Sequence, residues 1–117
     1  MLTLLSILES KGCSVAATLS DTMMGNEQFY VKMLKKLGNN KSIDKLEEAF
    51  AAKDVAACFA ASHDLKGMYG TLGLTPLLEL CKQIVEPARA GSMEGFEKSI
   101  PALRNLHNHF LEIITSN

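Results

Sequence analysis

The chain has 117 residues, the size of one domain built around one hydrophobic core. Hydrophobic residues make up 47% and charged residues 21%, which is the balance of a folded protein and excludes a disordered one. The formal net charge is −1 and no basic block is present, so neither nucleic acid nor an anionic membrane is expected as a partner. We expect a single domain over residues 1–117, with a short N-terminal helix in 1–13 and a helical bundle over 14–114.

The first twelve residues, MLTLLSILESKG, are apolar but lack a basic leader and a cleavage site. Glu9 and Lys11 interrupt the apolar run too early for a membrane span. The three cysteines form no CxxC pair and lie in apolar helical contexts, which predicts buried, reduced thiols. These features predict a cytoplasmic protein, and we expect a bacterial one.

The predicted elements are all helical, because Val and Ile never alternate as they do in strands. In chain order we expect helices over 2–10, 14–23, 27–37, 43–52, 54–73, 76–89 and 93–114. Their ends follow from helix start and stop residues, such as Asp54 and Ser42 as caps, Thr75-Pro76 at a helix start, and Gly91 at a helix end. Pro101 is expected to kink or divide the last helix. The expected fold is an all-α, antiparallel four-helix bundle with short extra N-terminal helices.

Three glycines follow a histidine closely in SHDLKGMYGTLG, residues 62–73. Each glycine inside a helix costs about 0.5–1 kcal/mol relative to alanine. On a helical wheel centred on Leu65, a buried stripe emerges, and His63 lies about 160° from its centre, facing outward. The residues that share its face are small (Ala56, Ala60, Gly67 and Gly70), and Lys66 flanks them. We interpret this face as bare backbone left open for a large partner, whereas Gly73 is a helix stop.

Other side chains were assigned from the same helical wheels. Phe29 is predicted to face inward, and Met24 to fill the core with the other methionines. Tyr69 is placed at the edge of the buried stripe with its hydroxyl toward solvent. His107 and His109 are two residues apart, so they cannot converge on a metal ion and are expected at the surface or rim. We expect no metal and no cofactor in this chain.

The residues around His63 resemble those of histidine-containing phosphotransfer (HPt) domains. HDLKG followed by GTLGL is similar to the signature His-x-Leu-Lys-Gly with a second glycine six residues on. LLELCKQIVEPARAG looks like the helix that follows in that family, and MGNEQFYVKMLKKL resembles a helix start of small stand-alone members. The resemblance covers about residues 14–113.

The resemblance implies a phosphorelay carrier of two-component signalling. His63 would accept a phosphoryl group from a receiver-domain aspartate and pass it on, and Lys66 would offset the phosphoryl charge. Gly67 would give the partner access, and Arg89 matches a basic position of the neighbouring helix. Ala60, Gly70 and Lys82 are predicted to join Gly67 and Arg89 in partner docking. The expected partners are response-regulator receiver domains and a hybrid histidine kinase, the chain being a monomer without autonomous kinase activity.

The sequence departs from the family pattern at Val85, where many members carry Glu or Gln bonded to the histidine ring. Gln83 and Glu86 are the candidates for this orienting contact, with water or no contact as the alternatives. Because Val85 cannot make that contact, a second function stays open. In it, an HPt-like bundle binds a kinase or receiver as an adaptor or inhibitor while His63 is idle.

Overall fold

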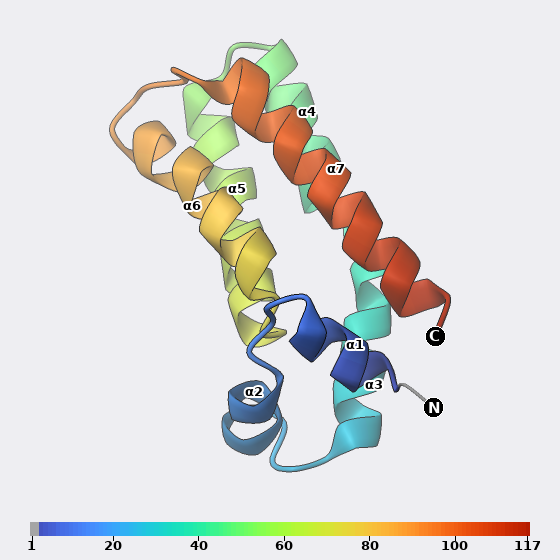
Figure 1. Cartoon of the computed structure of the whole chain (residues 1–117). Coiled ribbons are helices and arrows are strands. Elements are labelled where there is room, and N and C mark those ends of the chain that lie inside the picture. Colours follow the sequence, from blue (N-terminus) through green and yellow to red (C-terminus); the bar gives the residue numbers. More distant parts are fainter. Residues whose placement is uncertain (1–2) are drawn as a thin grey trace.

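The computed structural model describes residues 3–117, and every regular element in that range is helical (Figure 1). The elements are α1 (Leu4–Ser10), α2 (Val15–Asp21), α3 (Glu27–Lys35), the 3₁₀ turn η1 (Lys36–Asn39), α4 (Ser42–Ala51), α5 (Val55–Thr71), α6 (Thr75–Arg89) and α7 (Phe96–Thr115). Leu2, the first residue of the first predicted helix, lies outside the described residues. The expectation of an all-helical chain is confirmed for residues 3–117.

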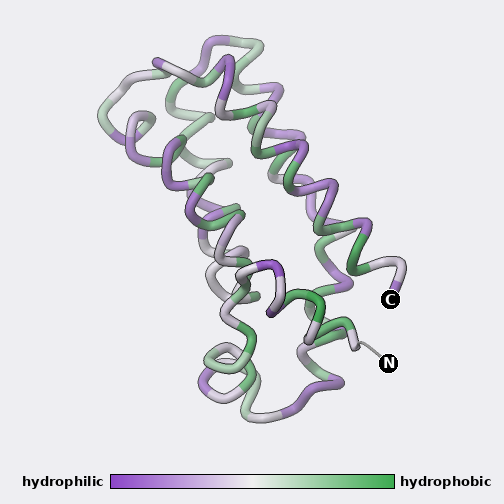
Figure 2. Tube along the Cα trace, viewed as in Figure 1, coloured by the Kyte–Doolittle hydropathy of each residue, from purple (hydrophilic) through white to green (hydrophobic). Residues whose placement is uncertain are grey.

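Helix α5 lies between α4 and α6, and α7 packs against α3, α4 and α6 (Figure 1). Along α7 and α4, hydrophilic and hydrophobic residues recur with the helical turn, so each helix has one apolar side (Figure 2). The apolar sides meet in one core, whose largest fully buried members include Tyr30, Tyr69, Phe96 and Phe110. The described helices therefore form a helical bundle.

Helix α5 begins and ends where its capping residues require. The Asp54 carboxylate accepts a hydrogen bond from the Ala57 amide at 3.0 Å, which satisfies one free N–H of the first turn. At the other end Gly73 has φ +70°, and the Leu74 amide donates to the Tyr69 carbonyl at 3.0 Å. A Cβ on Gly73 would lie 2.2 Å from Thr18 Oγ1, so this glycine is both a helix stop and a contact with α2.

Two predicted helix starts and the predicted break at Pro101 differ from the structure. Ser42 is the first residue of α4 rather than its cap, because Lys41 holds the N-cap position without a side-chain capping bond; the Ser42 amide donates to Asn40 Oδ1 at 2.8 Å. Helix α7 begins at Phe96 rather than 93, because Gly95 at φ +85° precedes it. Pro101 does not divide α7, which continues to Thr115.

One residue of α3, Phe29, was predicted on the wrong side of the helix. Phe29 is 44% exposed, whereas Tyr30 is fully buried and its hydroxyl donates to the Leu72 carbonyl at 2.7 Å. Tyr30, Leu34 and Leu37 follow one another at helical spacing, and Phe29 lies about 100° from them around the helix. The prediction for Phe29 was therefore wrong.

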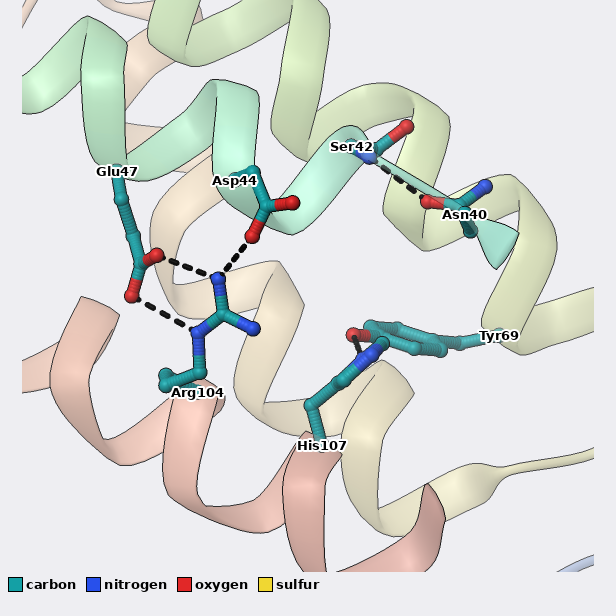
Figure 3. A network of polar contacts seen from close by, with 7 residues as sticks. All are labelled: Asn40, Ser42, Asp44, Glu47, Tyr69, Arg104 and His107. Carbon is teal, nitrogen blue, oxygen red and sulfur yellow. Dashed lines mark hydrogen bonds and ion pairs between the residues drawn. The ribbon is translucent and has the colours of Figure 1, made fainter. Parts of the chain in front are cut away.

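Tyr69 and His107 form a buried pair between α5 and α7, contrary to both predictions (Figure 3). Tyr69 is fully buried and His107 is 2% exposed, with 2.7 Å between the hydroxyl oxygen and Nδ1. Burial, and then the positive charge of Arg104, lower the pKa of His107, which favours the neutral ring that can share one hydrogen with the Tyr69 hydroxyl. A histidine is buried here because the tyrosine supplies its missing hydrogen-bond partner. His109 is exposed, as expected.

Beside this pair, Arg104 of α7 holds two carboxylates of α4 (Figure 3). Its Nε donates to Glu47 at 3.0 Å, and its Nη2 donates to Asp44 and Glu47. The hydrogen bond from Arg104 lowers the pKa of Asp44. These ion pairs connect α7 to α4 close to the buried His107.

The remaining expectations concern sulfur-containing and apolar residues. Cys13, Cys58 and Cys81 are buried free thiols, as predicted. Met24 is 90% exposed in the loop after α2, so its assignment to the core was wrong; its φ of +55° belongs to the turn that Gly25 completes. Within residues 3–117, none of the helices has the length and apolar character needed to cross a membrane.

Candidate functional site

His63 lies exposed near the middle of α5. Its neighbours Ser62 and Leu65 are fully buried, so the core side of the helix faces away from the imidazole. The outward position expected from the helical wheel is the one found. A nucleophilic ring nitrogen is thus open to another molecule.

The glycines of the His63 face are open, as the sequence predicted. A Cβ built on Gly67 or Gly70 would meet nothing within 4 Å, and Ala60 one turn before the histidine is exposed. Neither glycine has the positive φ that excludes other residues, so the backbone does not require glycine there. Space above the helix, rather than packing or strain, distinguishes these two glycines from Gly73.

A shallow hollow of about 700 Å³ surrounds this face. It brings together His63, Lys66 and Gly70 from α5 with Lys82 from α6. The rest of its lining consists of Thr22, Gly67, Thr71 and Leu78. Two lysines from different helices therefore line one hollow with the imidazole, and the Lys82 ammonium also pairs with the Glu79 carboxylate at 3.3 Å. The positive charge of the lysines favours a ligand that carries negative charge.

Gly67 also lines a second hollow of about 250 Å³ on the other side of α5. That hollow is bounded mainly by apolar residues of α3, η1 and α5, including Met33, Leu37 and Leu72. The backbone at Gly67 is therefore a low ridge between a cationic hollow and an apolar one. A large side chain at Gly67 would stand between them.

The residues of α6 lie beside the histidine without bonding to it. Val85 is fully buried, Gln83 and Glu86 are exposed, and within residues 3–117 no hydrogen bond reaches the His63 ring. Glu86 instead forms an ion pair with Arg89, with 3.4 Å between Oε2 and Nε. The orienting contact considered for Gln83 or Glu86 is thus not made in this structure.

The sequence reasoning missed Phe59, which lies one turn before His63 on α5. The centroids of the two rings are 5.5 Å apart and their planes are inclined by 37°. On the other helix, the Arg89 guanidinium carbon is 5.2 Å from the Phe59 centroid. The i, i+4 spacing of Phe59 and His63 was the available signal. Thr22 and Leu78 were also missed, since helical wheels do not show which residues of α2 and α6 approach α5.

The site combines a nucleophilic ring with nearby lysines. Within the part of the chain that is described, no three His, Cys, Asp or Glu side chains cluster as a metal site would. A neutral imidazole attacks phosphorus, and nearby cations stabilise charge on the phosphoryl oxygens. An exposed ring, two lysines and open backbone provide these elements.

Comparison with known protein families agrees with this geometry. Residues 38–112, most of the chain, match the Hpt domain. The chain therefore belongs to the Hpt domain family, whose members are phosphotransfer carriers in two-component signalling. Searches of curated proteins and of solved structures returned no match.

Proposed function

We propose that this protein is a phosphorelay carrier in which His63 receives a phosphoryl group from the aspartyl phosphate of a receiver domain and passes it to another receiver aspartate. Family membership supports the carrier role. The observation that carries the assignment to His63 is its exposure on α5 beside two glycines with open space above them. His107 is buried and His109 lies outside the cationic hollow, so neither offers a comparable site.

In the proposed step, a ring nitrogen of neutral His63 attacks phosphorus, the new N–P bond forms, and the acyl O–P bond breaks. The aspartate leaves as a carboxylate, and the imidazole keeps or releases its remaining proton to solvent. Lys66 and Lys82 lie in the same hollow and would stabilise charge on the equatorial oxygens. The receiver would supply any metal ion, and return of the group to an aspartate follows the same path in reverse.

Docking would use the open ridge and its two flanks. Gly67, Gly70 and Ala60 leave room for a receiver domain, and Lys82 and Arg89 border the approach from α6. We infer that the chain acts as a monomeric, cytoplasmic domain. We also infer that α4, α5, α6 and α7, with α3 extending α4, form an antiparallel four-helix bundle to which α1 is an addition.

The test is phosphoryl transfer from a receiver domain charged with acetyl phosphate. The wild-type chain should acquire an acid-labile, base-stable phosphate, and His63→Gln should acquire none. His109→Gln is the matched control, since it removes an exposed histidine outside the hollow and should label normally. Circular dichroism of all three should be equal. Labelling of His63→Gln at the wild-type level would exclude His63 as the acceptor.

A second function is favoured by one observation: the His63 ring receives no hydrogen bond within residues 3–117, and Val85 is buried. In that case the chain binds a kinase or receiver as an adaptor and is not phosphorylated. The same experiment separates the two functions. If the chain is an adaptor, the wild type and His63→Gln should bind receivers with equal affinity, and neither should take up label.

A further inference from the structure

The orientation of the His63 ring is not fixed by a hydrogen bond within residues 3–117. An exposed histidine turns about two side-chain torsions, and transfer in line with the leaving oxygen requires one orientation. Val85 is buried, Gln83 is exposed and Glu86 is paired with Arg89, and no side-chain hydrogen bond fixes the His63 ring in the described residues. The Phe59 ring lies beside it, with 5.5 Å between the two ring centroids and an angle of 37° between the ring planes.

The Phe59 side chain is itself held in place. Its ring is partly buried against the core, and on α6 the Arg89 guanidinium lies 5.2 Å from its centroid. Arg89 is in turn paired with Glu86 at 3.4 Å. A guanidinium near an aromatic ring is attracted by the ring quadrupole. Side chains from two helices therefore form a continuous row that ends at the histidine.

We propose that Phe59 is a positioning residue, which holds the His63 imidazole by ring packing in the orientation needed for transfer, and that Arg89 acts through Phe59. The inference rests on the proposed function and deepens it. It assigns to an aromatic contact the role for which the family pattern uses Glu or Gln at position 85. It also assigns Arg89 a role different from direct contact with the phosphoryl group.

The first test compares Phe59→Leu with Phe59→Tyr, which keeps the ring, and with Phe29→Leu, a control at an exposed phenylalanine outside the hollow. In NMR spectra of the unphosphorylated chain, the His63 ring protons should lose their ring-current shift in Phe59→Leu and keep it in Phe59→Tyr. At saturating receiver, kcat for transfer should fall about three- to tenfold in Phe59→Leu, the factor that one aromatic pair corresponds to. KM should stay constant, and both control variants should transfer normally.

The second test asks whether Arg89 acts through Phe59. If it does, Arg89→Gln should lower kcat in the wild-type chain but cause almost no further loss of kcat in Phe59→Leu, because the contact between Phe59 and His63 is already lost there. Multiplicative losses in the double variant would mean that Arg89 contacts the phosphoryl group directly, and would overturn this part of the inference.

The outcomes distinguish this inference from the proposed function. If the wild-type chain takes no label, the phosphorelay function fails and the positioning role fails with it. If the wild type takes label but Phe59→Leu transfers at the same kcat with unchanged His63 shifts, only the positioning role is refuted.

Discussion

Alanine substitutions at the two glycines of α5 and at Gly73, which follows the helix, should have opposite effects on stability. Gly67 and Gly70 are helical and a new Cβ meets nothing within 4 Å, so each alanine should raise the free energy of unfolding by about 0.5–1 kcal/mol. Gly73 has φ +70°, and its Cβ would lie 2.2 Å from Thr18 Oγ1 and 3.0 Å from the Ser14 carbonyl oxygen. Gly73→Ala should therefore lower stability by about 2 kcal/mol or more.

The assay is urea unfolding followed by circular dichroism, with thermal unfolding beside it. The double variant Gly67→Ala, Gly70→Ala should gain about 1–2 kcal/mol, or about 4 °C in Tm for each kcal/mol. In the transfer assay, Gly67→Leu should block receiver docking and raise KM. Ala102→Leu, an exposed position on α7, is the control for added bulk and should transfer normally. A loss of stability in Gly67→Ala would refute the conclusion that this position is open.

Three further predictions concern the core and its polar contacts. Burial lowers the pKa of His107 in the folded chain, against the opposing effects of Asp44 and Glu47, so the unfolded chain takes up the proton at a higher pH than the folded chain does. The free energy of unfolding should therefore fall as the pH drops below about 6.5, and this pH dependence should be weaker in His107→Gln. Arg104→Met should cost about 1 kcal/mol in urea unfolding at low salt and less at high salt, and equal losses at both would contradict an ionic contribution. Burial raises the pKa of Cys13 to about 11 and of Cys81 to about 12. A thiol reagent at about pH 8 should therefore label the folded chain slowly, and it should label all three cysteines quickly in denaturant. Fast labelling of the folded chain would refute the burial of the thiols.

The sequence predicts the helices well because their ends are set by local chemistry. Asp54 caps α5 and Gly73 stops it, both as expected, and the Asn26 side chain caps α3 by accepting the Phe29 amide. Helical periodicity likewise places His63 outward, since the buried side of α5 is continuous from Cys58 to Tyr69. These features depend on spacing that a single segment contains.

Contacts between distant segments were not predictable in the same way. Nothing in the sequence around Tyr69 indicates that His107, 38 residues later, is its hydrogen-bond partner. Considered alone, each of the two residues is of a type common at the rim of a core. The choice of Tyr30 over Phe29 for the core also depends on a distant group, the Leu72 carbonyl that its hydroxyl bonds. The row from Glu86 through Arg89 to Phe59 spans two helices, so it emerges only when α5 and α6 are packed together.

The region shared with the family begins at residue 38, yet Thr22 of the preceding segment borders the hollow that contains His63. That segment is fastened to the end of α5 by the Ser14 amide, which donates to the Gly73 carbonyl at 2.9 Å, and by the Tyr30 hydroxyl on Leu72. A shortened protein cut at the family boundary would keep the histidine and both lysines but lose one wall around them. In the proposed function, this preceding segment would form part of the surface on which a receiver docks, while the reacting groups all lie after position 38.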